Sequence, residues 1–378
     1  MPRRRLLLEW CAILLVSTVL AWWAAASGAT ARFDLALLDR ASAWRAAPAS
    51  PEVVIVAIDE ASLARQGAWP WDRRRMAELV ERLDRAGAQA IVLDVLFTEP
   101  TLARADEALA SAIAKAGNVI APHGLVAARD RAEGLDILPP VAPVAAALRA
   151  TGHVLTEPDR DGVVRHVPLM VASEGGRAVP QLLVAMHRWL LGSDPQVLAG
   201  SSPVAAPALA YRPAGAYRTV PAAAVLAGEV PAQFLRGRIV MVGMPETLPV
   251  TIVPVGATAA GLGDILPVPA VAGSVMPGVE VQANLWQAML DNEFVRPLSP
   301  GLLPWISVVP VLVLFLAFWR LPPRACLAVA VALLAAIVLG ALALAALAGL
   351  WGAPGGGPLG PVLGLSPVGW RRAGAERD

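Results

Sequence analysis

The chain has 378 residues, of which 56% are hydrophobic and 16% charged, and its mean hydropathy is +0.58. These values exclude an ordinary soluble domain, which is less apolar, and a pure bundle of membrane helices, which carries fewer charges. The net charge of +1 gives no electrostatic basis for binding nucleic acid, so no nucleic-acid partner is expected.

The N-terminal segment predicts a cytoplasmic stretch over residues 1–5 and an uncleaved transmembrane helix over residues 6–26. The apolar run is about 20 residues long, which is the length needed to cross ~30 Å of hydrocarbon. Three arginines precede it and favour a cytoplasmic N-terminus. A cleaved signal peptide is the alternative. The length of the run and the interfacial pair Trp22 and Trp23 favour the anchor.

Residues 27–300 predict one extracytoplasmic domain of the α/β class, with a mainly parallel sheet covered by helices. Val53–Ile58, Ala90–Asp94 and Arg238–Val242 are continuous apolar runs, as expected for strands buried on both faces. The amphipathic segment Arg73–Ala86 lies between the first two runs, which makes a βαβ unit. Another helix and strand are predicted over residues 105–116 and 118–121.

The middle of the domain predicts a β-hairpin. Residues 158–162 read Pro-Asp-Arg-Asp-Gly, which is turn chemistry, and the segments 152–156 and 163–171 flank them. A helix is then expected from Pro180 to Leu191. The last helix of the domain is expected over Val279–Leu290, behind a Pro-Gly pair.

Two further transmembrane helices are predicted over residues 302–319 and 325–350. The short loop between them carries Arg320 and Arg324 and belongs inside by the positive-inside rule. The tail at 351–378 is rich in Gly and Pro and is interpreted as a degenerate fourth span. The chain is therefore expected to be a multi-pass protein of the bacterial inner (plasma) membrane, surrounded by the lipid bilayer, with its main domain extracytoplasmic.

Three aspartates form the first candidate site. Asp59, Asp94 and Asp106 are expected near the carboxyl edge of the sheet, where open α/β sheets bind ligands and where carboxylates can hold Mg²⁺ or Ca²⁺. The structural alternative is that they cap helices and support turns, with Arg73 as their ionic partner. No metal site is assigned, because neither the four histidines nor the stretch beginning at Glu157 has the spacing of a metal-binding motif.

The aromatic turn Trp69-Pro70-Trp71 forms the second candidate. Its two rings could stack on a ligand, or they could pack beneath the loop as core. No nucleophile elbow, zinc-protease motif or Cys-His pair is present in the sequence. An enzyme and a cofactor are therefore not expected.

The whole region between the membrane segments resembles the CHASE domain of type two, the cyclase- and histidine-kinase-associated sensory extracellular domain. The resemblance rests on Gly67–Trp71 with Arg73, on Asp159-x-Asp161-Gly162-x-x-Arg165, on Asp264, and on Pro277–Glu280 followed by Ala283-Asn284. The sequence departs from the family pattern at Asp72, at residues 265–267 and at Gln282. The candidate ligand-binding residues are Asp59, Trp69, Trp71, Arg73, Asp94, Asp106, Asp161, Arg165 and Asp264.

The resemblance implies a membrane-anchored sensory protein of a bacterial signal-transduction system, which detects a small molecule or an envelope signal of unknown identity. Family members usually continue into a cytoplasmic cyclase or kinase, and this sequence has few residues after Trp370. Either a homodimer or a separate signalling partner in the membrane is therefore expected to read the signal, or the chain is a truncated sensor. The alternatives are an extracytoplasmic metal-dependent hydrolase using Asp59 and Asp94, and a ligand-free membrane scaffold.

Overall fold

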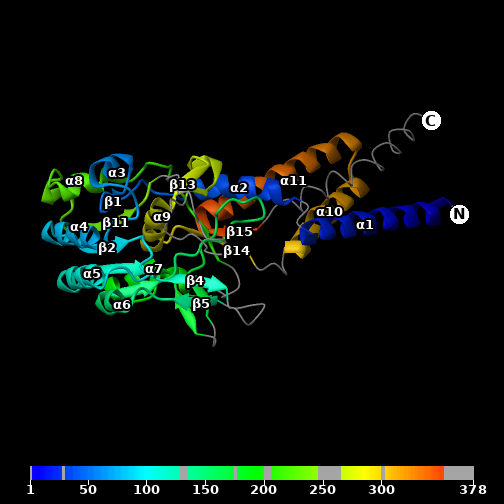
Figure 1. Ribbon diagram of the computed structural model, residues 1–378. Coiled ribbons are helices and arrows are strands. Elements are labelled where there is room, and N and C mark those ends of the chain that lie inside the picture. Colours follow the sequence, from blue (N-terminus) through cyan, green and yellow to red (C-terminus); the bar gives the residue numbers. More distant parts are fainter. Residues whose placement is uncertain are drawn as a thin grey trace. The chain divides into compact units, whose positions relative to one another are not determined.

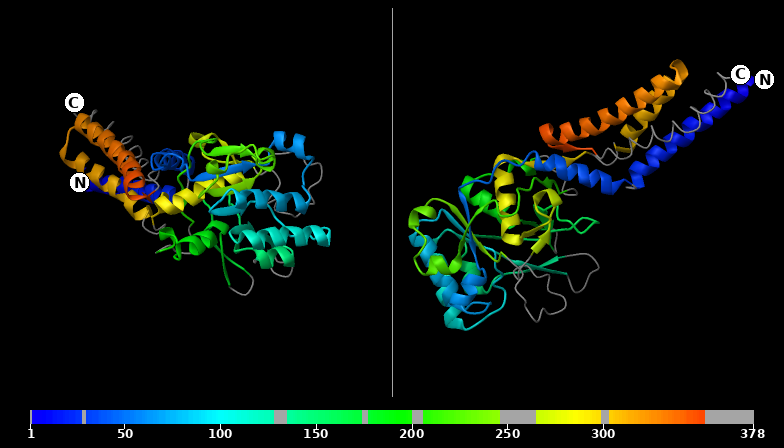
Figure 2. Two further views of the ribbon diagram at one scale, coloured as in Figure 1. Left: turned by 90° about the vertical axis from the view of Figure 1, so that its left-hand side faces the viewer. Right: turned by 90° about the horizontal axis from the view of Figure 1, so that it is seen from above.

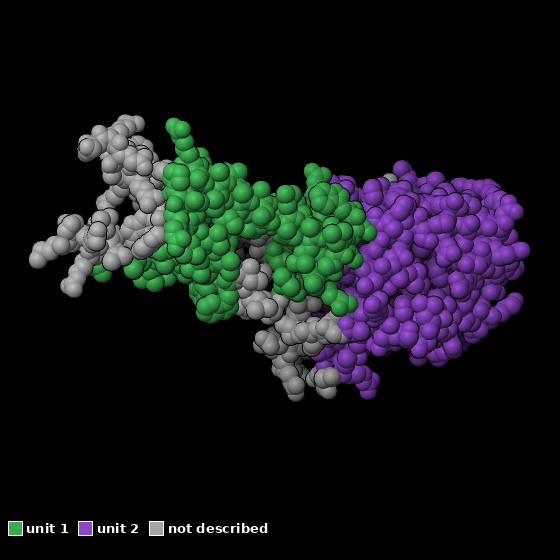
Figure 3. Space-filling model, turned by 180° about the vertical axis from the view of Figure 1, so that it is seen from behind, with its two compact units in different colours: residues 1–45, 295–378 green, residues 46–294 purple. Residues whose placement is uncertain are grey.

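The fold comes from a computed structural model, which describes residues 2–27, 30–127, 135–173, 177–199, 206–245, 265–298 and 303–352. The chain divides into two compact units (Figure 3). Unit 1 comprises residues 1–45 and 295–378, and unit 2 comprises residues 46–294.

A six-stranded parallel sheet forms the centre of unit 2. Its strands are β1 (Val53–Ala57), β2 (Ala90–Leu93), β3 (Val119–Pro122), β6 (Ala150–Gly152), β10 (Arg218–Pro221) and β11 (Ile239–Gly243). Their order is β10-β1-β11-β2-β3-β6, and every neighbouring pair is parallel. Ile239 lies opposite Val53 on one side and Ala90 on the other. The prediction that these three apolar runs share one parallel sheet is therefore confirmed.

Helices cover both faces of this sheet (Figures 1 and 2). They are α3 (Glu60–Gln66), α4 (Arg73–Arg85), α5 (Ala103–Ala116), α6 (Ala142–Ala147), α7 (Leu182–Leu191), α8 (Ala222–Leu226) and α9 (Gly278–Asp291). Apolar residues of α4, α5, α6 and α8 pack with Val54 and Ile91 in one core. Residues of α7 and α9 pack with Ile55 and Val92 in the other. Both faces of each central strand are thus buried, which explains why the strands are apolar at every position.

The helix α4 shows how the sequence specifies these elements. Met76, Leu79, Val80 and Leu83 recur at helical spacing, and all four are buried against the sheet. At its C-terminal end Gly87 has a φ of 80°, a conformation that glycine adopts without a steric penalty. The predicted helix over residues 73–86 is confirmed.

Unit 2 also contains short strands outside the main sheet. They form three antiparallel pairs: β4 (Gly124–Ala127) with β5 (Leu135–Leu138), β7 (Met170–Ala172) with β8 (Ala178–Pro180), and β12 (Ile265–Pro267) with β13 (Val275–Pro277). A two-residue strand, β9 (Ala208–Leu209), precedes β10, and 3₁₀ turns lie at Gln196–Leu198, Ala232–Phe234 and Ala270–Ala272.

The hairpin predicted around residues 158–162 is wrong. The turn itself forms, since the Asp159 N–H donates to the Val163 carbonyl at 2.9 Å. The segments on either side of it do not form a strand pair, however, and are joined only by one isolated bridge, between Glu157 and His166. The segment before the turn instead contributes β6 to the parallel sheet. A Cβ at Gly152 would lie 2.6 Å from the Leu182 Cα. The glycine therefore lets the N-terminus of α7 lie directly on β6, a tertiary contact that outweighs the local turn signal.

Unit 1 contains the apolar terminal segments. Its elements are α1 (Pro2–Ser27), α2 (Ala31–Ala43), α10 (Leu303–Arg320), α11 (Pro323–Ala343) with a π-helical turn at Leu344–Ala348, and β15 (Leu350–Trp351), which pairs in parallel with the end of β14 (Phe294–Pro297). Within this unit α1 lies along α10, and α10 packs on α11. Arg45 donates from Nη1 to the Ala346 carbonyl at 2.9 Å, beside the end of α11.

One helix among the described residues is long and apolar enough to cross a membrane. It runs from Arg324 to Ala348 and has a hydropathy of 2.9. The helices α1 and α10 contain shorter apolar stretches, Leu14–Trp23 and Val308–Ala317. The spans expected over residues 6–26 and 302–319 stay predictions. The degenerate span expected in the tail lies outside the described residues from position 353 onward.

Candidate functional site

Polar residues line the carboxyl edge of the parallel sheet, where open α/β sheets bind their ligands. Asp59 comes two residues after β1, and Asp94 directly follows β2. His123 directly follows β3, and His153 directly follows β6. The two aspartates were predicted for this edge from the sequence, whereas the two histidines were not.

The structure does not bring the aspartates together around one point. Asp59 caps α3, where its Oδ1 accepts the Ser62 N–H at 2.8 Å. Strand β11 lies between β1 and β2, so Asp59 and Asp94 follow strands that are roughly 10 Å apart, two sheet spacings. Oxygen ligands of Mg²⁺ or Ca²⁺ lie about 2.0–2.6 Å from the ion. Among the described residues, no group of three or more His, Cys, Asp or Glu side chains could hold a metal ion.

Asp106 instead forms a buried ion pair with Arg73. The Arg73 Nε lies 3.4 Å from the Asp106 Oδ1, and the guanidinium lies 4.6 Å from the centre of the Phe97 ring. Thr101 donates its N–H and its hydroxyl to the same carboxylate, at 2.9 and 2.8 Å. Burial acts to raise the pKa of Asp106, but the Thr101 hydrogen bonds and Arg73 outweigh it and hold that pKa below its usual range. These contacts join the starts of α4 and α5.

The tryptophan turn is part of this same structural region. Trp71 is only 5% exposed, and its Nε1–H donates to the Gly67 carbonyl at 2.9 Å. Trp69 is half-buried and meets Trp71 edge to face, with ring centroids 6.0 Å apart. The contacts of Trp71 are therefore those of a core residue, and Trp69 is the more accessible of the two rings.

The remaining predicted residues lie in the turn after β6. Arg165 is buried, and its Nη1 donates to Asp159 at 3.0 Å and to Asp161 at 2.9 Å. The hydrogen bond from Arg165 holds the pKa of Asp161 below its usual range. This double ion pair closes the turn on itself. Asp264 lies outside the described residues.

The two histidines of the sheet edge are buried side by side. Because Pro122 of β3 is paired with Gly152 of β6, the next residues along the chain, His123 and His153, are neighbours across the two strands. His123 is 6% exposed, and His153 is fully buried. Burial, reinforced by His123, lowers the pKa of His153 to about 3, and burial also lowers the pKa of His123. Both rings are therefore neutral near pH 7.

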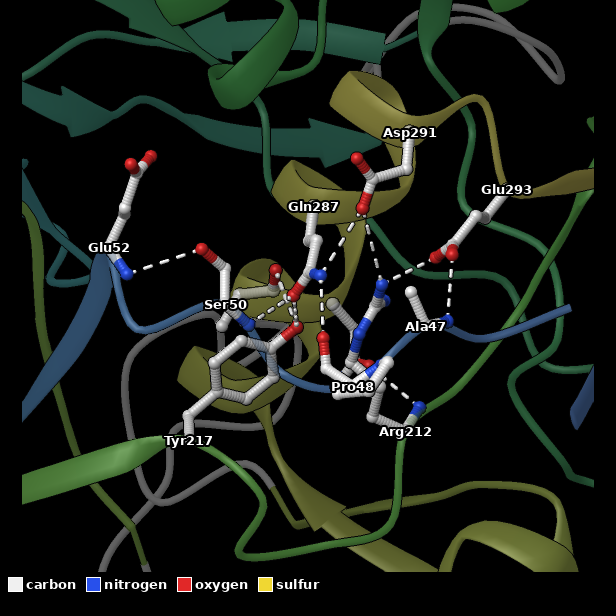
Figure 4. A network of polar contacts seen from close by, with 11 residues as sticks. Ala47, Pro48, Ser50, Glu52, Arg212, Tyr217, Gln287, Asp291 and Glu293 are labelled. Carbon is white, nitrogen blue, oxygen red and sulfur yellow. Dashed lines mark hydrogen bonds and ion pairs between the residues drawn. The ribbon is translucent and has the colours of Figure 1, made fainter.

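A second polar cluster surrounds Arg212 inside unit 2, and Figure 4 shows it from close by. Arg212 is 1% exposed, and its Nη2 donates to the Glu293 Oε2 at 2.5 Å. The other Glu293 oxygen accepts the Ala47 N–H at 2.7 Å. The Arg212 N–H donates to Asn284 of α9, at 2.9 Å. One buried carboxylate thus joins Arg212 to the incoming segment, residues 46–50, which leads into β1.

Gln287 of α9 makes a second connection to the incoming segment (Figure 4). Its Oε1 accepts the Ser50 N–H at 2.9 Å and the Tyr217 hydroxyl at 3.1 Å. Its Nε2 donates to the Pro48 carbonyl at 2.9 Å and to Asp291 at 3.2 Å. The start of the domain and the last turns of its final helix are therefore held together by partly buried hydrogen bonds.

Sequence reasoning missed this cluster, although it singled out Glu280 and Asn284 as family residues. The usable signal was Arg212 itself, a cation at the end of the apolar stretch Ala-Leu-Ala-Tyr that begins at Ala208. A buried arginine requires an acidic partner, and the nearest acidic group to follow α9 is Glu293. Their 81-residue separation is what hid the pair.

The comparisons with known proteins give one match. The family model described as the CHASE2 domain matches residues 12–321. Neither the curated proteins nor the solved structures contain a match to the chain. The family assignment therefore rests on the match to the CHASE2 domain model.

Proposed function

The chain belongs to the CHASE2 domain family of sensory extracellular domains, and we propose that it is a membrane-anchored sensor whose unit 2 lies outside the cytoplasm. The proposed anchor includes α1, α10 and α11, with α11 the most apolar. The basic residues in the first turn of α1 and around the α10–α11 connection support a cytoplasmic side at those points. The domain is proposed to work by binding rather than catalysis, because Asp59 and Asp106 are occupied in structural contacts.

The observation that carries this proposal is the position of Glu293. It bonds to the incoming segment at Ala47 and to Arg212, and it lies two residues beyond the end of α9. The chain leaves unit 2 just beyond it, at residue 294, and enters unit 2 at residue 46. A signal that favours one arrangement of α9 therefore acts on both connections to unit 1 at once, and can shift a two-state equilibrium there.

Orientation is tested with alkaline-phosphatase fusions, because this reporter is active only outside the cytoplasm. We expect a fusion at Ala49 to be active and a fusion at Pro322 to be inactive. An inactive fusion at Ala49 would overturn the proposed orientation.

Transmission is tested by disulfide crosslinking in membranes. Pairs of cysteines, one in α1 and one in α10, are introduced after replacing the native Cys11 and Cys326, because these two helices pack together. We expect Glu293→Gln to change which pairs crosslink. The milder Tyr217→Phe, which removes only the hydroxyl that contacts Gln287 and the Ala283 carbonyl, should change them in the same direction.

The matched control is Glu229→Gln, which makes the same change in an exposed ion pair with Arg65. We expect its crosslinking pattern to equal that of the unmodified protein. Identical patterns in all variants would refute transmission through the Glu293 connection.

A further inference from the structure

The buried imidazole pair, His123 and His153, has hydrogen-bonding groups without a partner among the described residues. These groups are the Nε2 atoms of the two rings, and both atoms are buried. The Nδ1 of His153 accepts the N–H of Leu155 at 3.2 Å, so the neutral ring carries its proton on Nε2. Buried polar groups without partners are uncommon in folded proteins, and each calls for a physical explanation.

Protonation of His153 in this position conflicts with its surroundings. A second proton would sit on Nδ1 and face the Leu155 N–H, which replaces a hydrogen bond by two opposed donors. The Nε2–H would still have no acceptor. The charged ring therefore can form only after residues 153–155 separate from their present contacts.

The groups that face the pair do not compensate a positive charge. His123 comes from β3, and the N-terminus of α7, a positive dipole end, comes from the other side through Gln181 and Leu182. Farther along α7, His187 contacts the Ser193 carbonyl and Arg188 pairs with Asp194. On α9, Gln282 is uncharged and Glu280 accepts the Gly215 N–H. Within the described residues, no carboxylate forms an ion pair with either imidazole of the pair.

A short chain of contacts connects His153 to α9. The His153 N–H donates to Pro180, and the His153 carbonyl accepts the Leu182 N–H at 2.8 Å. Between those residues, the Gln181 side chain is fully buried and its Nε2 donates to the Gln282 Oε1 on α9 at 2.7 Å. Separation of β6 from the start of α7 would therefore disturb the side-chain contact that holds α7 to α9.

We propose that the proton is a ligand of this domain, bound by the His123–His153 pair when acidification opens the contact between β6 and the start of α7. The proposal rests on the proposed function, since it makes α9 the route by which the opening reaches unit 1. It requires no cavity in the closed state, because the ligand is a proton that enters when the contact opens.

The expected size of the effect follows from the pKa of His153, about 3 in the closed state against an ordinary 6.5. Above pH 6.5 neither the closed nor the open state is protonated, so pH has no effect. Below pH 6.5 the open state binds a proton and the closed state does not until about pH 3, so the open state gains population. Between pH 7.5 and 5.5 the open population should rise about tenfold through His153 alone.

The test is hydrogen–deuterium exchange of the full chain in lipid nanodiscs at pH 7.5 and 5.5, corrected for the intrinsic pH dependence of exchange. We expect peptides covering residues 150–155 and 181–187 to open about tenfold more at pH 5.5. His153→Asn, which keeps an acceptor for Leu155 but does not titrate, should remove the difference. His123→Asn, a second variant in case the first fails to fold, should reduce it. The control His166→Asn should leave it unchanged.

Equal protection of the unmodified protein at both pH values would overturn the proposal, as would an unchanged pH response in His153→Asn. The α1–α10 crosslinks separate this result from the proposed function. If they respond to Glu293→Gln but exchange does not respond to pH, the transmission proposal stands and the proton site fails. If exchange responds to pH and the crosslinks respond to neither, the proton site stands and the transmission proposal fails.

Discussion

Replacing Glu293 by glutamine should destabilise unit 2 strongly, because it removes the buried carboxylate that pairs with a buried cation. Arg212 then keeps only the half-exposed carboxylate of Asp291, 3.7 Å away. The Arg212 side chain is 1% exposed and the Glu293 side chain 8%. Two of the Arg212 nitrogens, Nε and Nη1, already have no hydrogen-bond partner within the part of the chain that the structure describes. Glutamine retains an oxygen for the Ala47 N–H, so the main loss is the charge. Breaking one side of a buried ion pair typically costs about 3–5 kcal/mol. We expect a loss of that size in the free energy of unfolding.

The assay is urea-induced unfolding of the full chain in detergent, followed by tryptophan fluorescence. The control is Glu229→Gln, whose partner Arg65 lies 2.6 Å away with both side chains about half exposed, so water screens the lost charge. Its unfolding midpoint should not move. The double variant Arg212→Met with Glu293→Leu should regain much of the lost stability, because no uncompensated charge is left. A loss below about 1 kcal/mol in Glu293→Gln would refute the reasoning.

Three further predictions concern the same unit. Trp71→Ala should lower the free energy of unfolding by about 3–5 kcal/mol, since the ring is buried, and an unchanged melting temperature would contradict this. Gly152→Ala should cost about 1–3 kcal/mol through overlap with the Leu182 backbone, and wild-type stability in urea would show that the strand and helix can move apart freely. The pKa of Asp106 is depressed, so its ionised carboxylate stabilises the fold fully above its ordinary pKa of 3.8, and this stabilisation is lost as the pH falls through the lower pKa of the folded state. Asp106→Asn should therefore make the melting temperature less dependent on pH in this acid range. An equally steep dependence in the variant would refute this prediction.

The sequence was most informative where burial is two-sided. Val53–Ile58 is apolar at every position, and such a run indicates a strand covered on both faces wherever it lies in the sheet. Strand order is a different matter. The position of β11 between β1 and β2 depends on packing between distant segments, and no periodicity encodes it. The hairpin prediction failed for the same reason, because the partner of β6 is β3 and not the segment behind the turn.

The candidate site shows the same contrast between local contacts, which the sequence suggests, and contacts between distant segments, which it does not. Asp59 and its capping of α3 involve residues three positions apart, so the sequence was sufficient to suggest that structural role. The pairing of His123 with His153 exists only because β3 and β6 are neighbours, and their 30-residue separation carries no recognisable motif. The Arg212–Glu293 pair is hidden in the same way.

The central position of β11 also has a consequence for the order in which the domain folds. Until residues 239–243 are available, the five other strands fall into two groups, β10 with β1, and β2 with β3 and β6. The contact that joins the groups pairs Val53 with Ile239, so closing it requires a long loop, which slows folding. Before then, β1 and β2 each present an unpaired apolar edge of the kind that aggregates or recruits chaperones. A nascent chain must therefore be kept unfolded until β11 has emerged, and truncations before it should yield insoluble protein rather than a smaller domain.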